Sequence, residues 1–138
     1  MPTPLSAQLW TYRARIIGNH DGDTVGNPST GSVVIDAGFY VAFSPPHGLR
    51  ILGVNTPEIN SPDPETRNRA LAARDYTAAW LAGHASHLGG GCTADWPFAV
   101  RTRKADVFAR PLTSVECGQA HDLASDLLQA GFAVAFTP

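Results

Sequence analysis

The chain has few cysteines and no long apolar run, and each shortage excludes a class of protein. Its 138 residues include two cysteines, Cys92 and Cys117, which are too few for a disulfide framework. We expect two reduced thiols, which would form a bridge only if paired strands and an oxidising compartment allowed it. No run of about 18 apolar residues occurs in the sequence, so no membrane-spanning helix and no membrane partner are expected.

The chain is also poor in positive charge. Lysine and arginine together number 10 against 12 acidic residues, which gives a net charge of −2. This balance excludes a protein that coats nucleic acid with a broad basic surface, but it does not exclude an enzyme that holds one phosphate. Residues 1–6 lack a positive segment followed by an apolar core, so no signal peptide is expected. Two locations are therefore compatible with the sequence: the cytoplasm, and a virion or other complex.

The order of the expected elements favours a small barrel. The length fits one domain, residues 1–138, with residues 1–9 as an N-terminal extension. Alternation and turn residues predict strands at 10–17, 32–35, 39–43, 49–54, 92–100 and 111–115, and helices at 65–83 and 121–130. The expected fold class is α+β: a five-stranded OB-type Greek-key β-barrel with two or three packed helices.

The same patterns give expectations for packing. The long helix should bury a face marked by Ala72, Tyr76, Ala79 and Gly83, with Ala73 and Trp80 beside it. The last helix should turn Leu123, Leu127 and Leu128 inward. If the strands around 101–110 form a hairpin, counting outward from that loop places Cys92 near Cys117.

Two polar clusters interrupt this framework. Asp21-Gly22-Asp23-Thr24 is either a plain turn or a turn that directs Asp23 and Asp21 into a site, where carboxylates suit Ca²⁺ or Mg²⁺. Asn55-Thr56-Pro57-Glu58 is either an ordinary strand exit or a second half of that site. In the latter case the Asn55 side chain and the Thr56 carbonyl face the metal, and Glu58 serves as general base.

Two arginines have similar alternatives. Arg50 opens the apolar run 51–54, so it needs a partner if it is buried: either one of these acids or a phosphate. Arg110 ends the polar loop 101–110 and is either a solvated arginine or a second phosphate ligand.

These motifs together resemble those of the staphylococcal nuclease (thermonuclease-like) family. The matching segments are 21–25, 49–58, 106–112 and 122–133, and the likeness covers residues 10 to 136 in the family's order. In the third segment Phe108 and Ala109 stand where the family has Tyr and Gly.

The resemblance implies a Ca²⁺-dependent nuclease that hydrolyses DNA and RNA with little sequence preference and leaves 3′-phosphates. Asp23, Asn55 and Thr56 would hold the Ca²⁺, with Asp21 in support. Glu58 would activate the attacking water, while Arg50 and Arg110 would bind the phosphate. The substrate would be RNA or single-stranded or locally melted DNA. Phe108 and Phe136 would stack on its bases if they do not serve in the core.

Two departures from the family leave other functions open. Asn55 stands where the best-known members carry Asp, which removes one negative charge and weakens the expected Ca²⁺ binding. Residues 26–48 form an enlarged hairpin or loop insertion, read either as a longer hairpin or as a surface for a partner in a protein assembly. The alternatives are therefore a non-catalytic module that binds nucleic acid or builds a larger assembly, such as a phage particle, and an unrelated barrel with accidental motifs.

Overall fold

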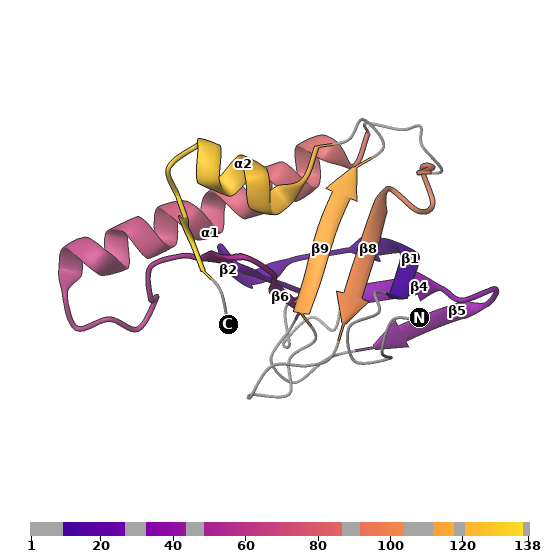
Figure 1. Cartoon of the computed structure of the whole chain (residues 1–138), viewed down its shortest axis with the longest axis horizontal. Helices are drawn as coiled ribbons and strands as arrows, with labels where there is room; N and C mark the ends of the chain where they lie inside the picture. The colour runs from indigo at the N-terminus through magenta and orange to yellow at the C-terminus, as the bar shows by residue number, and fades with distance from the viewer. Residues whose placement is uncertain are drawn as a thin grey trace, which may run out of the picture.

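The computed structural model describes residues 10–26, 33–43, 49–86, 92–103, 112–117 and 121–136. Within these ranges the chain forms an α+β fold of ten strands and two helices. The strands are β1 (Trp10–Ile16), β2 (Asn19–Asp21), β3 (Thr24–Val25), β4 (Val33–Asp36), β5 (Tyr40–Phe43), β6 (Leu49–Ile51), β7 (Val54–Asn55), β8 (Phe98–Arg103), β9 (Leu112–Cys117) and β10 (Val134–Ala135). The helices are α1 (Pro64–His84) and α2 (Leu123–Gln129), which lie on the same side of the sheet (Figure 1).

Eight strands form one strongly curled, mixed sheet in the order β2-β3-β6-β9-β8-β1-β4-β5 (Figure 1). Strand β6 pairs with β9 in parallel, and the other pairs in this sheet are antiparallel. Only Ile17 and Gly18 separate β1 from β2, yet β1 borders β8 while β2 borders β3 at the end of the sheet. The continuous segment 10–21 thus takes part in two distant regions of the sheet.

The first predicted strands are confirmed as β1, β4 and β5, but the predicted strand 49–54 is divided. Leu52 and Gly53 turn the chain, and Gly53 has a φ of 87°, a conformation that favours glycine. Val54 and Asn55 therefore form β7, which pairs with β10 in a second, two-stranded sheet. This turn carries the chain from the main sheet into the two-stranded sheet, where Asn55 and Thr56 follow.

The strand predicted at 92–100 begins later than expected, and Cys92 and Cys117 are not cross-strand partners, although they lie close enough for Cys117 to raise the pKa of Cys92. Thr93 and Trp96 close a turn through reciprocal backbone hydrogen bonds, so the strand β8 starts at Phe98. Cys117 pairs with Phe98 rather than with Cys92. Both thiols are free and buried, as expected. Burial, followed by the charge of Cys117, raises the pKa of Cys92, which keeps it protonated at neutral pH.

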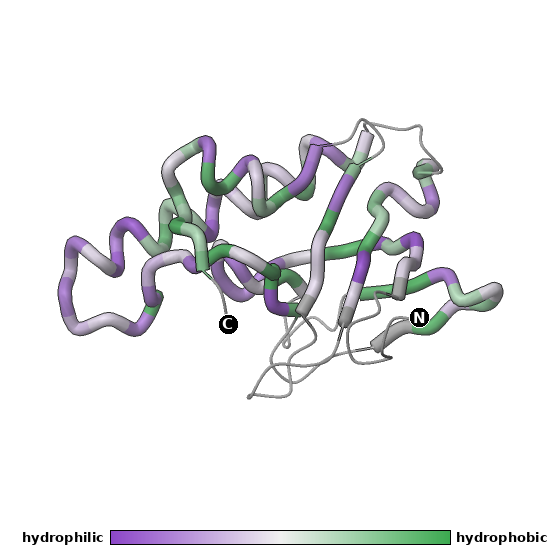
Figure 2. The backbone as a smooth tube through the Cα atoms, viewed as in Figure 1, coloured by the Kyte–Doolittle hydropathy of each residue, from purple (hydrophilic) through white to green (hydrophobic). Residues whose placement is uncertain are grey.

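Helix α1 covers the sheet with a face that is only partly the predicted one: Ala73 and Trp80, expected beside that face, are buried, but the residues expected to mark it are not. Asp63 caps its first turn by accepting a hydrogen bond from the Thr66 amide, and Pro64 begins the helix. Its buried residues are Ala70, Ala73, Thr77, Trp80 and Leu81, whereas the predicted Ala72, Ala79 and Gly83 are exposed and Tyr76 is half-buried. Polar and apolar residues mix along α1 (Figure 2), so its alanines give the sequence little contrast between faces.

Helix α2 is shorter than predicted and packs against the core through two of its leucines. Asp122 accepts a hydrogen bond from the Ser125 amide as its N-cap. Leu123 and Leu127 are fully buried, as expected, but Leu128 is 40% exposed, so its inward placement was wrong.

Strands β4 and β5 form a hairpin at one edge of the sheet. This hairpin belongs to the predicted insertion, residues 26–48. Its turn includes Gly38 at a φ of 85°, and next to it Phe39 and Tyr40 are 70% and 68% exposed. Residues 27–32 and 44–48 of the insertion lie outside the described ranges.

In the described parts of the chain, neither helix combines the length and apolarity needed to cross a membrane.

Candidate functional site

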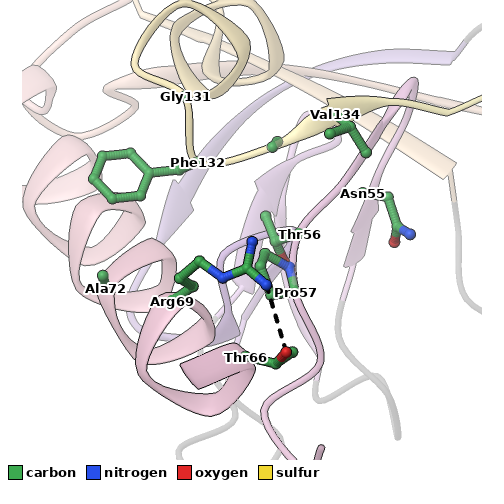
Figure 3. Close-up of a pocket in the computed structure, with 10 residues that line it drawn as sticks. Asn55, Thr56, Pro57, Thr66, Arg69, Ala72, Gly131, Phe132 and Val134 are labelled. Carbon is green, nitrogen blue, oxygen red and sulfur yellow. Dashed lines mark hydrogen bonds between the residues drawn. The ribbon is translucent and has the colours of Figure 1, made fainter. Parts of the chain in front are cut away.

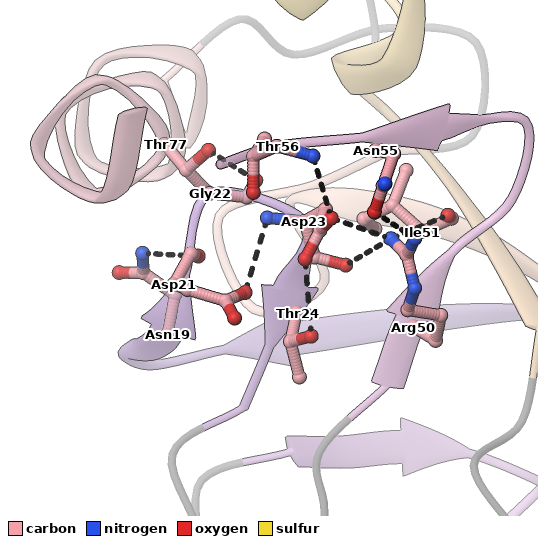
Figure 4. A network of polar contacts seen from close by, with 10 residues as sticks. All are labelled: Asn19, Asp21, Gly22, Asp23, Thr24, Arg50, Ile51, Asn55, Thr56 and Thr77. Atoms are coloured by element: carbon pink, nitrogen blue, oxygen red, sulfur yellow. Dashed lines mark hydrogen bonds and ion pairs between the residues drawn. The ribbon is translucent and has the colours of Figure 1, made fainter. Parts of the chain in front are cut away.

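The polar residues singled out in two sequence clusters meet in one network (Figure 4). Asp21 and Asp23 come from the β2–β3 turn, Arg50 from β6, and Asn55 and Thr56 from the end of β7. The structure therefore brings together the four residues Asp23, Arg50, Asn55 and Thr56, as the sequence predicted.

Backbone pairing sets the relative positions of these side chains. Thr24 pairs with Arg50 across β3 and β6, and the Ile51 amide donates to the Asp23 carbonyl at 2.8 Å. The turn is anchored to α1, because the Thr77 hydroxyl donates to the Gly22 carbonyl at 2.7 Å. A Cβ atom at Gly22 would lie 2.9 Å from the Cβ of Ala73, so only glycine allows the turn to pack this closely.

Asp23 and Arg50 form a buried ion pair at the centre of the network. Asp23 Oδ2 lies 2.8 Å from Arg50 Nη1 and also accepts a 2.8 Å hydrogen bond from the Thr56 amide. Arg50 Nη2 donates to Asn55 Oδ1 at 3.0 Å. The side chains of Arg50 and Asp23 are 9% and 7% exposed, so each charge depends on the other for compensation.

Asp21 adds a second carboxyl group beside Asp23. Its Oδ1 accepts a hydrogen bond from the Asp23 amide at 3.2 Å. Burial, then the charge of Asp23 and a hydrogen bond between the two carboxyl groups, raises the pKa of Asp21 to about 7. Two carboxyl groups this close resist carrying two negative charges in the metal-free protein.

The raised pKa of Asp21 predicts a pH-dependent stability. Folded Asp21 keeps its proton up to a pKa of about 7, whereas the unfolded chain releases it near 3.8. The folded state binds more protons in this window, so the free energy of unfolding should fall as the pH rises through it. Asp21→Asn should remove this contribution and stabilise the protein at pH 8 by ~1–2 kcal/mol, given that each pKa unit corresponds to about 1.4 kcal/mol and Asp21 is partly exposed.

Urea unfolding of the wild type and of Asp21→Asn, in EDTA from pH 4 to pH 8, measures this difference. Comparing the two proteins cancels the titration of the histidines, which both share. Parallel stability curves for the two proteins would contradict the raised pKa.

The oxygens of the network fit a hard divalent cation such as Ca²⁺. Asp23 Oδ1 accepts a weak hydrogen bond from the Thr24 hydroxyl at 3.5 Å, and buried Thr56 Oγ1 has no hydrogen-bond partner in the described part of the chain. Carboxylate and carbonyl oxygens are the protein ligands that Ca²⁺ prefers, and the Thr56 hydroxyl adds a further hard oxygen. The Arg50 guanidinium already binds Asp23 Oδ2 and Asn55 Oδ1, so a cation at these oxygens would share them with Arg50.

The other predicted site residues differ in how far the structure places them. Glu58 is exposed in the segment after β7, and its carboxylate forms no hydrogen bond or ion pair with the described residues. Phe136 is 45% exposed, and its ring centroid lies 6.0 Å from Arg50 Cζ, within reach of a cation–π contact. Phe108 and Arg110 lie outside the described residues.

A groove of about 410 Å³ adjoins the network and was not predicted (Figure 3). It shares Asn55 and Thr56 with the network and runs between α1 and the segment 131–134. Thr66 and Arg69 line it from α1, and Arg69 Nη2 donates to the Thr66 hydroxyl at 3.4 Å. The spacing of Thr66 and Arg69 by three residues on a helix was the available signal for a shared face.

No protein-family model and no curated protein matches this sequence. The resemblance to the staphylococcal nuclease family therefore depends on the motifs and their order.

Proposed function

We propose that this chain is a metal-dependent nuclease that hydrolyses phosphodiester bonds of DNA or RNA with little sequence preference. The observation that carries the proposal is the single buried network of Asp23, Arg50, Asn55 and Thr56. Asp23 and Thr56 are 33 positions apart in sequence, yet they share a 2.8 Å hydrogen bond. Accidental motifs would not be expected to converge in this way, which disfavours the unrelated barrel.

The strand order supports the finer proposal of an OB-type barrel. If β1 and β2 act as one bent strand, its first half borders β8 and its second half borders β3. The ring β1/β2-β3-β6-β9-β8 would then have five strands, with β4 and β5 outside it. The network lies at β2, β3 and β6 of this ring and at the neighbouring β7.

Arg50 has donors to spare for a phosphate. Of its five N–H groups, those of Nη1 bind the Asp23 carboxylate and two carbonyls, and one of Nη2 binds Asn55. Its Nε–H and the second Nη2–H have no partner among the described residues. These hydrogens would stabilise the negative charge that develops on a phosphate in the transition state, and Arg110 would add a second guanidinium.

The reaction would be a hydrolysis in which Glu58 acts as general base. Glu58 would accept a proton from water as the water oxygen forms a bond to phosphorus and the bond to the 5′ oxygen breaks, leaving a 3′-phosphate and a 5′ oxygen that takes a proton from solvent water. Glu58 lies two positions after Thr56, a distance of at most about 7 Å along the chain. A Ca²⁺ ion held by Asp23, Asn55 and Thr56, with Asp21 in support, would supply Lewis-acid polarisation of the phosphate.

The groove and Phe136 favour a single-stranded or locally melted substrate. Phe136 is exposed beside Arg50, so its ring can stack on an unpaired base. Arg69 in the groove gives a local positive charge that the net charge of −2 does not provide. Both features suit a flexible strand whose bases are accessible.

A direct assay tests the proposal: incubation of the protein with single-stranded DNA and RNA, with Ca²⁺ or with EDTA. We expect cleavage in Ca²⁺, no cleavage in EDTA, and products that carry 3′-phosphates. Absence of cleavage in Ca²⁺ would reject the nuclease.

A second candidate is a non-catalytic module that binds nucleic acid or joins a larger assembly, and one observation favours it. Asp23 and Asn55 already engage Arg50, and the Glu58 carboxylate forms no hydrogen bond or ion pair with the described residues, so the site is stable without substrate. The exposed Phe39 and Tyr40 of the insertion would provide its partner surface. Binding of single-stranded DNA without cleavage, under the same conditions, would identify this function.

A further inference from the structure

A second group of metal-binding side chains lies at the other end of α1. One ligand atom from each of His84, His121 and Asp126 lies within 4.8 Å of the other two. Cys117 lies beside this group, with its Sγ 3.8 Å from His84 Nδ1, but its thiol is not among the ligand atoms that all lie within 4.8 Å of one another. His84 ends α1 and Cys117 ends β9. His121 precedes Asp122, the N-cap of α2, and Asp126 lies in α2 itself.

The backbone fixes two of these residues relative to each other. The Cys117 amide donates to the His121 carbonyl at 3.0 Å, and Glu116 pairs with Asp122 in an isolated bridge. These contacts hold the end of β9 against the start of α2. Cys117 and His121 are thus positioned independently of any bound ion.

Trp80 orients the other two residues. Its indole Nε1 donates to Asp126 Oδ2 at 2.8 Å, and its ring lies 4.6 Å from the ring of His84. Hydrogen bonds that orient ligand groups are a common feature of metal sites in proteins. The cluster therefore has supporting contacts as well as ligands.

The ligand types select a transition metal rather than Ca²⁺. Imidazole, thiolate and a carboxylate are typical Zn²⁺ ligands, with bonds of about 2.0–2.3 Å. In a tetrahedral site such bonds separate neighbouring ligand atoms by roughly 3.3–3.7 Å. His121 Nδ1 lies 3.5 Å from Asp126 Oδ2, and Cys117 Sγ lies 3.8 Å from His84 Nδ1. Both distances are close to those that a tetrahedral ion requires, and the Cys117 thiol would move closer to the other ligand atoms on binding, since it lies outside the mutually close group of three.

We propose that His84, His121, Asp126 and Cys117 form a structural Zn²⁺ site that joins α1, β9 and α2. Four protein ligands leave no open position, which is typical of structural rather than catalytic zinc. His121 is 47% exposed at its side chain, so the ion can enter from solvent. The site is separate in residues and in ligand chemistry from the Asp23 network, and it does not depend on the proposed nuclease activity.

Titration of the full chain, prepared without a polyhistidine tag, with Co²⁺ and then Zn²⁺ tests this site. We expect one Co²⁺ per chain, the intense visible bands of tetrahedral Co²⁺, and a near-ultraviolet charge-transfer band from the Cys117 thiolate. Zn²⁺ should displace the Co²⁺ and raise the melting temperature. Absence of stoichiometric binding, or octahedral bands alone, would overturn the proposal.

Variants identify the ligands. His121→Gln should weaken Zn²⁺ binding by more than the ~10–100-fold that loss of an outer-shell partner costs. Cys117→Ser should abolish the charge-transfer band, and because Cys117 is buried, its folding is checked by circular dichroism. His20→Gln, which changes an exposed histidine on β2, and Cys92→Ser should leave the Co²⁺ spectrum unchanged. Unaltered binding by His121→Gln, or loss of binding in either control, would contradict the assignment.

Discussion

A Glu58→Gln variant is expected to cleave single-stranded DNA about 10²–10⁴-fold more slowly than the wild type, the usual contribution of a general base. Glutamine keeps the size of the side chain but cannot accept the proton of the attacking water. Because Glu58 is exposed and its carboxylate has no partner among the described residues, the fold should keep its stability. Initial rates at saturating Ca²⁺ measure the effect.

Glu65→Gln provides the matched control for Glu58→Gln. Glu65 is also exposed and lies seven positions further on, in the first turn of α1. Its replacement should leave the cleavage rate within about twofold of the wild type, since a surface substitution of this kind changes little. Equal rates for Glu58→Gln and the wild type would remove Glu58 from the reaction, whatever else the site does.

The second large effect is on stability. Arg50→Met should lower the free energy of unfolding by about 3–5 kcal/mol in EDTA, because it leaves the buried carboxylate of Asp23 without its cation. Ca²⁺ should restore part of this stability, since a divalent ion can compensate Asp23 and Asp21 together. Urea unfolding with EDTA and with Ca²⁺ measures both parts of the prediction.

Two comparisons separate the buried pair from an ordinary loss of arginine. The double variant Asp23→Asn/Arg50→Met should be more stable in EDTA than Arg50→Met alone, because it leaves no unpaired charge. Arg74→Met removes an arginine whose partner is Asp75 on the surface, and it should cost less than about 1 kcal/mol. A loss in Arg50→Met as small as that in Arg74→Met would show that the Asp23–Arg50 pair contributes little to the fold.

Local signals in the sequence were sufficient to predict most of the helices and strands, and also that Asp23 and Arg50 lie together. The turn at Gly22 and the strand that begins near Arg50 are set by nearby residues, and two neighbouring strands then place Asp23 beside Arg50. The division of that strand at Gly53 was not visible, because Leu52 and Val54 continue the apolar run on both sides of it.

Features that depend on tertiary contacts were missed. The buried face of α1 was misplaced because alanine occurs on several of its faces, and packing against the sheet selects Ala70 and Ala73 rather than Ala72. Cys117 lies opposite Phe98 because β8 pairs with β9 as far as Arg103 opposite Leu112, and the turn around Thr93 keeps Cys92 out of β8; the sequence specifies neither.

The cluster of His84, His121 and Asp126 has no sequence motif. His84 and His121 are 37 positions apart in the sequence. They meet only because α1 and α2 pack against each other. Spacing rules for metal sites apply to ligands on one element or one short loop, so they could not find this group.

One measurement tests most directly whether the Asp23 network is a metal-dependent nuclease site. It is the Ca²⁺ concentration that gives half-maximal cleavage of single-stranded DNA, compared between the wild type and Asn55→Asp. Both proteins should cleave, and Asn55→Asp should need less Ca²⁺, because it adds a carboxylate where Asn55 now offers an amide oxygen. Absence of cleavage by both proteins at every Ca²⁺ concentration, or the same half-maximal concentration for both, would contradict this function of the network.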